Sequence, residues 1–415
     1  MRILVVTQYF WPENFKINDL VNELVQRGHN VTVLTGVPNY PEGLVFQEFL
    51  NNPAHFSHYG GAEIVRVSLF PRGSSCKHLI LNYLSFVFSA SFQGLWKLRG
   101  QHFDVIFANQ LSPVTIGIPA AVMSFFKRAP LVLWVQDLWP ESLQATSVVQ
   151  SRTMLWIIGK LVSLIYNRCD LILAQSKSFI MHIQKYADSR IQVLYFPNWA
   201  ESIYEVSNAI PAPEVPLKPE SFDIMFAGNI GEAQDFPAIL DAAEILKSEL
   251  KIRWLIVGGG RMDDWVSSEI KKRNLHNSVL MLGQYPLDRM PSFFMHAKVL
   301  LVSLKDEVIF SMTIPSKLQT YLAAGKPLLG MINGEGAMVI KESASGVVCS
   351  AGDSNALADL VLKLSTISTE ELEAMGKKGL EYSKQEFDRS NLISKLEIMF
   401  EQINIAKPIV ENKSK

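Results

Sequence analysis

The chain has 415 residues and a formal net charge of -1, with 48% hydrophobic and 19% charged residues. Single domains mostly run to roughly 100–200 residues, so this length predicts at least two hydrophobic cores. The composition excludes intrinsic disorder, and a nucleic-acid partner is not expected because the chain lacks an overall basic field. Three widely spaced cysteines, Cys76, Cys169 and Cys349, form no metal-ligand pattern and favour a reducing, cytoplasmic location.

The first half of the chain alternates short β-branched runs with helix-length amphipathic segments, the pattern of parallel βαβ units. A helix over residues 15–26 is predicted to end at Gly28, which can adopt the left-handed conformation. Ser112, which precedes Pro113, and Ser176 are predicted N-caps of further helices. The strands are predicted at residues 3–7, 31–34, 64–67, 105–108, 131–135, 171–174 and 191–194.

Four prolines between residues 209 and 220 predict an interdomain linker, after which the strand and helix pattern starts again. The sequence therefore predicts an α/β protein with an N-terminal domain over 1–205, a C-terminal domain over 206–384 and a polar tail over 406–415. Strands of the second domain are predicted at 223–227, 253–257, 279–282, 299–302 and 327–331, and terminal helices at 370–383 and 390–405.

Two uncharged stretches, 79–96 and 105–126, approach the length that spans a bilayer, but polar residues and prolines interrupt both. We expect surface or core helices rather than membrane spans. Apolar helices are most often core, yet the phenylalanine and tryptophan content favours a face that contacts a membrane interface. The apolar run at residues 3–6 is too short for a signal-peptide core. The basic residues that end the apolar stretches are Lys97, Arg99, Lys127, Arg128 and Arg168.

Three glycine-containing loops follow predicted strands of the second domain. In open parallel sheets, ligands bind beyond the carboxyl ends of the strands. The loops at 226–231 and 257–260 predict that backbone amides approach an anion, although a plain tight turn remains the alternative. Neither loop has the G-x-G-x-x-G spacing of a dinucleotide site. Ser316 is a candidate helix cap, and Lys317 stands in a first helical turn, where the dipole disfavours a cation unless an anionic ligand is bound.

Glu335 lies between two glycines after a strand, where its carboxylate could accept the hydroxyls of a ribose, or it is an ordinary exposed loop acid. No D-x-D follows a strand, and the adjacent Asp263 and Asp264 make a poor magnesium pair. The sequence thus predicts no metal site and no cofactor. Charge on a departing anion is expected to be met by lysine, arginine and backbone amides.

Several motifs together carry a family resemblance over nearly the whole chain. They are YFWPE at 9–13, RGHNVTVLT at 27–35, QDLWP at 136–140, FPNW at 196–199, FAGNIG at 226–231, VGGG at 257–260, PSK at 315–317 and AAGKP at 323–327. With these motifs the chain resembles the family 4 glycosyltransferases of the GT-B fold. The resemblance implies two Rossmann-like domains that face each other across a cleft, with a C-terminal helix over 385–405 that packs back on the first domain.

The resemblance also implies that a nucleotide-sugar donor binds the C-terminal domain and the acceptor faces the N-terminal domain. Asp137 takes the place of the family's acidic or histidine residue near the reacting sugar. The residues assigned to the donor are Gly228, Asn229, Gly231, Gly258, Gly259, Ser316, Lys317 and Glu335, and those assigned to the acceptor side are Tyr9, Trp11 and Glu13.

The chain departs from the family pattern at the donor site. Many relatives carry two glutamates where this chain has Met312 and Thr320, and an arginine and a lysine where it has Asn229 and Gln234. We interpret Lys317, a catalytic candidate together with Asp137, and Glu335 as the replacements.

Within the family the chain is most similar to transferases resembling the N-acetyl-L-fucosamine transferases of O-antigen and capsule synthesis. That similarity implies a UDP-sugar donor, an undecaprenyl-diphosphate-linked saccharide acceptor and a peripheral position on the inner face of the plasma membrane. Two alternatives remain open, a nucleotide-sugar epimerase of the same fold and an inactive scaffold subunit. A dinucleotide-dependent dehydrogenase is disfavoured because the required glycine spacing is absent.

Overall fold

The computed structural model describes residues 1–41, 43–73, 76–145, 149–200, 204 and 209–406. The chain divides into two compact units, Met1–Phe196 with the segment from Ser390 onward, and Pro197–Arg389. The first boundary falls earlier than the predicted one at 205/206 because the segment after Phe196 is bonded within the second unit, where the Gln319 amide donates to the Asn198 carbonyl at 3.1 Å. Most of the predicted polar tail, 407–415, lies outside the described residues.

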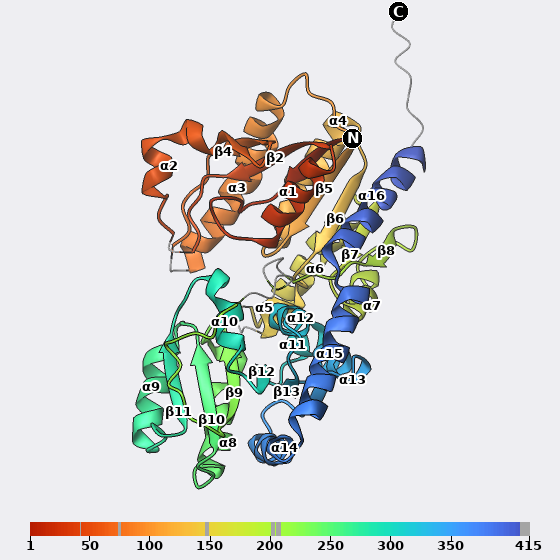
Figure 1. The fold of residues 1–415 in the computed structure, drawn as a ribbon. Helices are drawn as coiled ribbons and strands as arrows, with labels where there is room; N and C mark the ends of the chain where they lie inside the picture. The colour runs from red at the N-terminus through yellow and green to blue at the C-terminus, as the bar shows by residue number, and fades with distance from the viewer. Residues whose placement is uncertain (42, 74–75, 146–148, 201–203, 205–208, 407–415) are drawn as a thin grey trace, which may run out of the picture. The chain divides into compact units, whose positions relative to one another are not determined.

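The first unit contains an eight-stranded sheet with the order β3-β4-β2-β1-β5-β6-β7-β8 (Figure 1). All neighbours pair in parallel except β3 and β4, which are antiparallel. Strands β1, β2, β5, β6 and β7 are buried except for the first residues of β1 and β2, as expected for a parallel sheet with helices on both faces. The strands are β1 (Arg2–Val6), β2 (Asn30–Gly36), β3 (His58–Tyr59), β4 (Ala62–Val67), β5 (Val105–Gln110), β6 (Leu131–Val135), β7 (Leu171–Ala174) and β8 (Gln192–Tyr195).

The helices of the first unit connect these strands in the right order for repeated βαβ units. Gly28, with a φ of 87°, follows the first helix as the sequence predicts. The Ser176 hydroxyl accepts from the Phe179 amide and caps its helix, also as predicted. The helices are α1 (Lys16–Gln26), α2 (Gln47–Asn51), α3 (Cys76–Lys97), α4 (Gly117–Lys127), α5 (Glu141–Ala145), α6 (Arg152–Tyr166), α7 (Lys177–Gln184) and α16 (Arg389–Ala406).

The last helix, α16, belongs to the first unit although it follows the second in the chain. Arg27, directly after α1, donates to Ser394 Oγ at 2.8 Å and to Glu397 Oε2 at 2.9 Å. Phe400 is buried against the ring of Phe107 on β5, with the ring centroids 5.8 Å apart. The hydrogen bonds of Arg27, which we call the Arg27 clasp, and the contact between Phe107 and Phe400 therefore hold α16 against α1 and the sheet.

In the described part of the chain, one helical stretch, Lys77–Lys97 of α3, has the length and apolar composition that could cross a bilayer. Only 33% of its most apolar window is buried inside the structure. The buried side packs on α4: a Cβ added at Gly94 would lie 2.8 Å from Met123 Cε, so the glycine permits close approach of the two helices. The remaining side of α3 carries large apolar side chains at the surface.

The second unit contains six parallel strands in the order β11-β10-β9-β12-β13-β14, with helices on both faces (Figure 1). The strands are β9 (Phe222–Ala227), β10 (Ile252–Val257), β11 (Val279–Gly283), β12 (Val299–Ser303), β13 (Leu328–Met331) and β14 (Gly346–Cys349). The helices are α8 (Phe236–Ile245), α9 (Asp263–Lys272), α10 (Met290–Phe294), α11 (Val308–Met312), α12 (Ser316–Ala323), α13 (Gly334–Glu342), α14 (Ser354–Ser365) and α15 (Thr369–Glu386).

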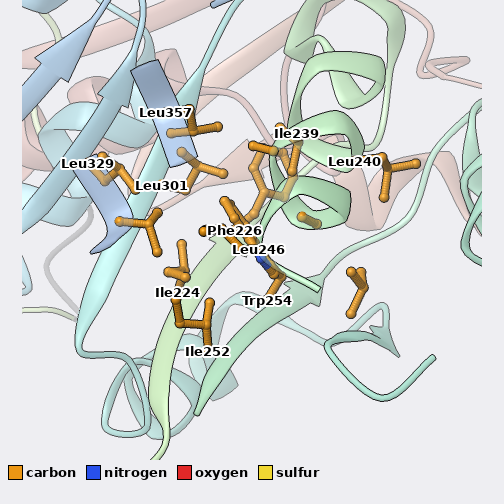
Figure 2. Close-up of a cluster of buried hydrophobic side chains, with 14 of the residues drawn as sticks. Ile224, Phe226, Ile239, Leu240, Leu246, Ile252, Trp254, Leu301, Leu329 and Leu357 are labelled. Carbon is orange, nitrogen blue, oxygen red and sulfur yellow. The ribbon is translucent and has the colours of Figure 1, made fainter. Parts of the chain in front are cut away.

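Figure 2 shows the core of this second unit, where β9 and β10 meet α8 and α14. Phe226 and Trp254 project from adjacent strands towards the helical layer, and both are at most 2% exposed. Full burial of one such side chain contributes roughly 2–3 kcal/mol to folding. This core fixes the strands whose carboxyl ends carry the glycine-containing loops.

Candidate active site

A cavity of about 420 Å³ opens at the carboxyl ends of β9, β10 and β11 in the second unit. This volume falls in the range of roughly 300–1,000 Å³ that is usual for small-molecule sites. The first turns of α12 form another wall. The lining residues are Tyr204, Ala227, Gly228, Asn229, Val257, Gly258, Gly259, Gln284, Tyr285, Leu287, Met290, Phe294, Ser316, Lys317, Thr320 and Tyr321.

Lys317 places an unpaired ammonium group in the wall of this cavity. Its Nζ has no hydrogen-bond partner among the described residues and lies 3.6 Å from the ring centre of Phe226. Burial lowers the pKa of Lys317 to about 7, because removal from water penalises the charged form. A buried charge without a partner is unfavourable, so this side chain is arranged for an anion that comes from outside the chain.

Two glycines of the predicted anion-binding loops, Gly228 and Gly258, use their amides within the protein. The amide of Gly228 donates to the Val257 carbonyl at 2.8 Å, and that of Gly258 donates to Gly283 at 2.8 Å. These amides are therefore engaged inside the protein and do not point freely at a ligand. The glycines instead permit close packing: a Cβ on Gly258 would lie 1.9 Å from the Gly228 carbonyl oxygen, and one on Gly228 would lie 2.6 Å from Lys317 Cε.

Free backbone donors come from the start of α12 rather than from the start of α8. Ser316 is the first residue of α12 and Pro315 takes the N-cap position, so the predicted cap by Ser316 is wrong. The first N–H groups of any helix lack partners inside it, and here those of Ser316 and Lys317 accompany side chains that line the cavity. The N-cap of α8 is itself an acid, Asp235, which disfavours an anion there.

The other predicted donor residues fall into two groups. Asn229 and Gly259 line the cavity together with Lys317. Gly231 does not line it; its amide donates to the side chain of Gln234 at 3.1 Å, which shapes the loop after β9.

Glu335 is not among the residues that line this cavity. It lies in the first turn of α13 and is only 6% exposed, so it is not the exposed loop acid that the sequence allowed. Its predicted contact with a ribose stays a prediction.

Asp137 lies at the carboxyl end of β6 in the first unit. Its Oδ2 accepts hydrogen bonds from Trp139 Nε1 at 3.2 Å and from Ser142 Oγ at 3.1 Å. Burial nevertheless raises the pKa of Asp137 to about 6, because loss of water outweighs the hydrogen bonds that favour the carboxylate. A carboxyl group with this pKa can take up or release a proton close to neutral pH.

Two glutamines that the sequence analysis missed hold the Asp137 loop. Gln110, at the end of β5, donates to the Asp137 carbonyl at 2.7 Å, and Gln175, after β7, donates to the Gln136 carbonyl at 2.8 Å. The loop is thereby fixed from both neighbouring strands. The available signal was a glutamine at the end of each of these apolar strands, where the hydrophobic run stops.

The acceptor-side residue Glu13 is already engaged within the first unit. Its carboxylate is 4% exposed and accepts from the backbone amides of Phe10, Asn39 and Tyr40 at 3.0, 2.8 and 2.7 Å. Glu13 therefore joins the loops after β1 and β2.

The other two acceptor-side residues also lie in packed surroundings. Trp11 packs on Phe56, with ring centroids 4.9 Å apart. Tyr9 is 3% exposed and stacks on Phe15 at 5.7 Å. Direct contact of Tyr9, Trp11 or Glu13 with an acceptor stays a prediction.

Among the residues that the structure describes, no group of three or more His, Cys, Asp or Glu side chains could hold a metal ion. Independence from a metal ion stays a prediction.

Each of the two units matches a known protein family. The model described as glycosyltransferase family 4 matches residues 17–197, and the one described as glycosyl transferases group 1 matches residues 212–382. The chain is 24% identical over 328 residues to the probable glycosyltransferase WbjE of Pseudomonas aeruginosa, across 77% of this chain and 80% of that protein. It is 25% identical over 349 residues to the putative colanic acid biosynthesis glycosyl transferase WcaI of Escherichia coli K12, across 78% and 82%.

Solved structures show the same fold at low identity. Sucrose-phosphate synthase from Thermosynechococcus elongatus superposes with a TM-score of 0.73 at 14% identity, over 98% of this chain and 100% of that one. HepE of Anabaena, solved in complex with UDP and glucose, gives 0.66 at 15% identity, over 97% and 99%. The chain is therefore a glycosyltransferase with the GT-B fold, with a family 4 module in its first unit and a group 1 module in its second.

Proposed function

We propose that this glycosyltransferase moves a hexose-type sugar from a UDP-sugar to a lipid-diphosphate-linked saccharide during assembly of a bacterial surface polysaccharide, without a metal ion. The observation that carries the proposal is the buried, unpaired Lys317 ammonium in the cavity of the group 1 module. A nucleoside diphosphate supplies the anion that this group lacks, and its departure from the sugar creates the charge that needs stabilisation.

In the proposed reaction an acceptor hydroxyl attacks the anomeric carbon of the donor. The bond from that carbon to the UDP oxygen breaks, and Lys317 with the first amides of α12 stabilises the negative charge on the departing UDP. Asp137 accepts the proton of the attacking hydroxyl, which its pKa of about 6 permits at neutral pH. Asp137 belongs to the family 4 module and Lys317 to the group 1 module.

The relatives support the choice of donor and product class. HepE, which shares the fold, is solved with UDP and glucose and with UDP-glucose, so a uridine nucleotide fits this architecture. The E. coli relative is named for colanic acid biosynthesis. N-acetyl-L-fucosamine is our candidate for the donor sugar, on the sequence resemblance alone.

An exposed apolar face supports a membrane location for the acceptor. Phe92 and Trp96 of α3 are 70% and 65% exposed, and Phe125 of α4 is 74% exposed. The two helices end close together, because the Lys127 ammonium donates to the carbonyl of Leu98 just beyond α3. Aromatic side chains beside cations suit the interface of an anionic bilayer, so we propose that this face rests on the inner leaflet of the plasma membrane.

The membrane part of the proposal is tested by sedimentation with vesicles. Wild type should co-sediment with vesicles of phosphatidylglycerol and phosphatidylethanolamine but weakly with phosphatidylcholine vesicles. Replacing Phe92 and Phe125 together by serine should release it, whereas serine at the control position Leu217, an exposed leucine of the other module, should not. Equal binding of both variants would contradict this surface.

The transfer reaction is tested with a panel of UDP-sugars against polyprenyl-diphosphate saccharides, with the products identified by mass spectrometry. A product heavier than the acceptor by one sugar is the expected result. Isomerised donor without acceptor would instead indicate the epimerase, and tight UDP binding without transfer to any acceptor would indicate the scaffold.

A further inference from the structure

Arg72 is a cation without a carboxylate partner at the carboxyl edge of the first sheet. It follows β4, and three tyrosines surround it. Its Cζ lies 5.2 Å from the ring centre of Tyr40, it hydrogen-bonds to Tyr9, and it lies within electrostatic reach of Tyr83. In the part of the chain that the structure describes, no Asp or Glu forms an ion pair with its guanidinium.

Arg66, on β4 itself, is a second arginine at the same edge of the sheet, and its guanidinium is bound within the protein. Its guanidinium donates to the carbonyls of Gly36 and Trp11 and lies within electrostatic reach of the carboxylate of Glu13. The charge of Arg66 is therefore balanced inside the protein. The charge of Arg72 is not balanced by an ion pair with any described Asp or Glu.

The backbone around Arg72 is fixed before any ligand arrives. Its amide donates to Asn39 Oδ1 at 2.9 Å. Gly43, with a φ of 78°, packs so closely on the Arg72 carbonyl that a Cβ there would lie 1.6 Å from the oxygen. The ring of Tyr40 is supported in turn by Tyr9, with centroids 5.3 Å apart. A cation held in this way loses little conformational freedom when it binds an anion.

Tyr83 connects this cation to the proposed catalytic group. The tyrosine lies within electrostatic reach of both Arg72 and Asp137, and its hydroxyl hydrogen-bonds to Ser112. Ser112 in turn accepts from Trp139, whose indole also donates to Asp137. An anion on Arg72 would therefore be connected through this network to Asp137, the proposed proton acceptor.

We propose that Arg72, with the hydroxyls of Tyr40 and Tyr83, binds an anionic group of the acceptor, and so sets which acceptors are used. The inference rests on the proposed transfer reaction. Two chemical sources fit the site, the diphosphate that joins the saccharide to its lipid and a carboxylate on an acidic sugar. Arginine recognises either group through paired N–H donors.

The test compares Arg72→Gln with wild type on three acceptors that share one saccharide. The first carries a short polyprenyl diphosphate, the second an uncharged alkyl chain, and the third an uncharged alkyl chain with a uronic acid in the saccharide. The KM for the acceptor whose anion binds Arg72 should rise roughly 10- to 100-fold, as expected for loss of a charge-assisted contact. The KM for the uncharged acceptor and the affinity for UDP should not change.

Arg190→Gln is the matched control, because Arg190 is an exposed arginine of the same module that forms an ion pair with the nearby Asp188. Its KM values should equal those of wild type. Tyr83→Phe, which removes one hydroxyl and keeps the ring, should raise the same KM less than Arg72→Gln does. If Arg72→Gln does not fold, Tyr83→Phe replaces it as the test variant.

Two results would overturn the proposal: an equal rise in KM for the uncharged acceptor, or weaker UDP binding with unchanged acceptor KM. If wild type transfers to no acceptor, the proposed function fails separately. The anion site is then judged by titrating pyrophosphate into UDP-saturated protein, where weaker binding by Arg72→Gln supports it and equal binding refutes it.

Discussion

Two buried cations of the group 1 module, Arg253 and Lys317, have opposite surroundings. Arg253, at the start of β10, is 5% exposed, and its guanidinium forms two bonds with Asp223 on β9, at 2.7 and 2.6 Å. Lys317, near the carboxyl ends of the same strands, has no hydrogen-bond partner for its ammonium group among the residues that the structure describes. At the amino end of β10, the charge of Arg253 is therefore neutralised by a carboxylate of the protein. At the carboxyl ends of the strands, where the cavity lies, the charge of Lys317 is left for a ligand to neutralise.

Asp223→Asn breaks the balanced pair and should have the largest effect. The neutral amide leaves the Arg253 charge buried without compensation, which costs about 3–5 kcal/mol. Urea denaturation of the variant should show this loss in the free energy of unfolding. A change below about 1 kcal/mol would show that the pair is not a structural requirement.

Lys317→Met removes the unbalanced cation and should separate activity from stability. Turnover should fall roughly 10- to 1,000-fold, because one electrostatic stabiliser of the leaving group is lost. Thermal unfolding should occur at the same temperature or a higher one, since an unpaired buried ammonium no longer opposes folding. Near-normal turnover in this variant would remove Lys317 from the mechanism.

Gly228→Ala tests whether the position of the ammonium matters. The added Cβ would lie 2.6 Å from Lys317 Cε and must displace that side chain, so affinity for UDP should fall by about tenfold. Gly352→Ala is the matched control, because it has a positive φ of 77° but only an ordinary contact at 3.7 Å. Calorimetric titration of UDP into both variants should show a loss only for Gly228→Ala.

The pH dependence of donor binding should reveal the same lysine. The pKa of Lys317 is about 7 in the empty cavity, and a diphosphate favours the charged form, so binding takes up a proton above that pH. Affinity for a UDP-sugar should therefore fall roughly fivefold from pH 7 to pH 8. Lys317→Met should show no such change, and a wild-type affinity that stays constant over this range would contradict the account.

A chelator should have the smallest effect of all. If lysine and helix amides replace a divalent ion at the diphosphate, EDTA should change the transfer rate by less than about twofold. Restoration of a lost rate by added Mg²⁺ or Mn²⁺ would show that a metal takes part.

The sequence predicts most elements of both sheets, because buried parallel strands are continuous apolar runs with turns between them. Shorter elements cannot be predicted in this way. The two-residue β3 has no run to detect. Ser112 illustrates a second limit: a 3-10 turn follows Pro113, and α4 begins only at Gly117, so the predicted cap is wrong.

The site was predictable where a residue conflicts with its local setting. Lys317 stands out in sequence because a cation in a first helical turn is unfavourable. Gln110 and Gln175 did not stand out, because their function depends on which strands become neighbours in the sheet. Arg72 is likewise ordinary in sequence, and only the tertiary structure shows that its charge lacks a counterpart.

The Arg27 clasp has a consequence for how the chain is made. The family 4 module is encoded in two pieces, and the group 1 module lies between them. During translation, Phe107 cannot contact Phe400 until almost three hundred further residues have been synthesised. At usual elongation rates this takes roughly 15–60 s. The group 1 module can therefore fold on the ribosome before the other is complete, and truncations that remove α16 should yield a nascent product prone to capture by chaperones.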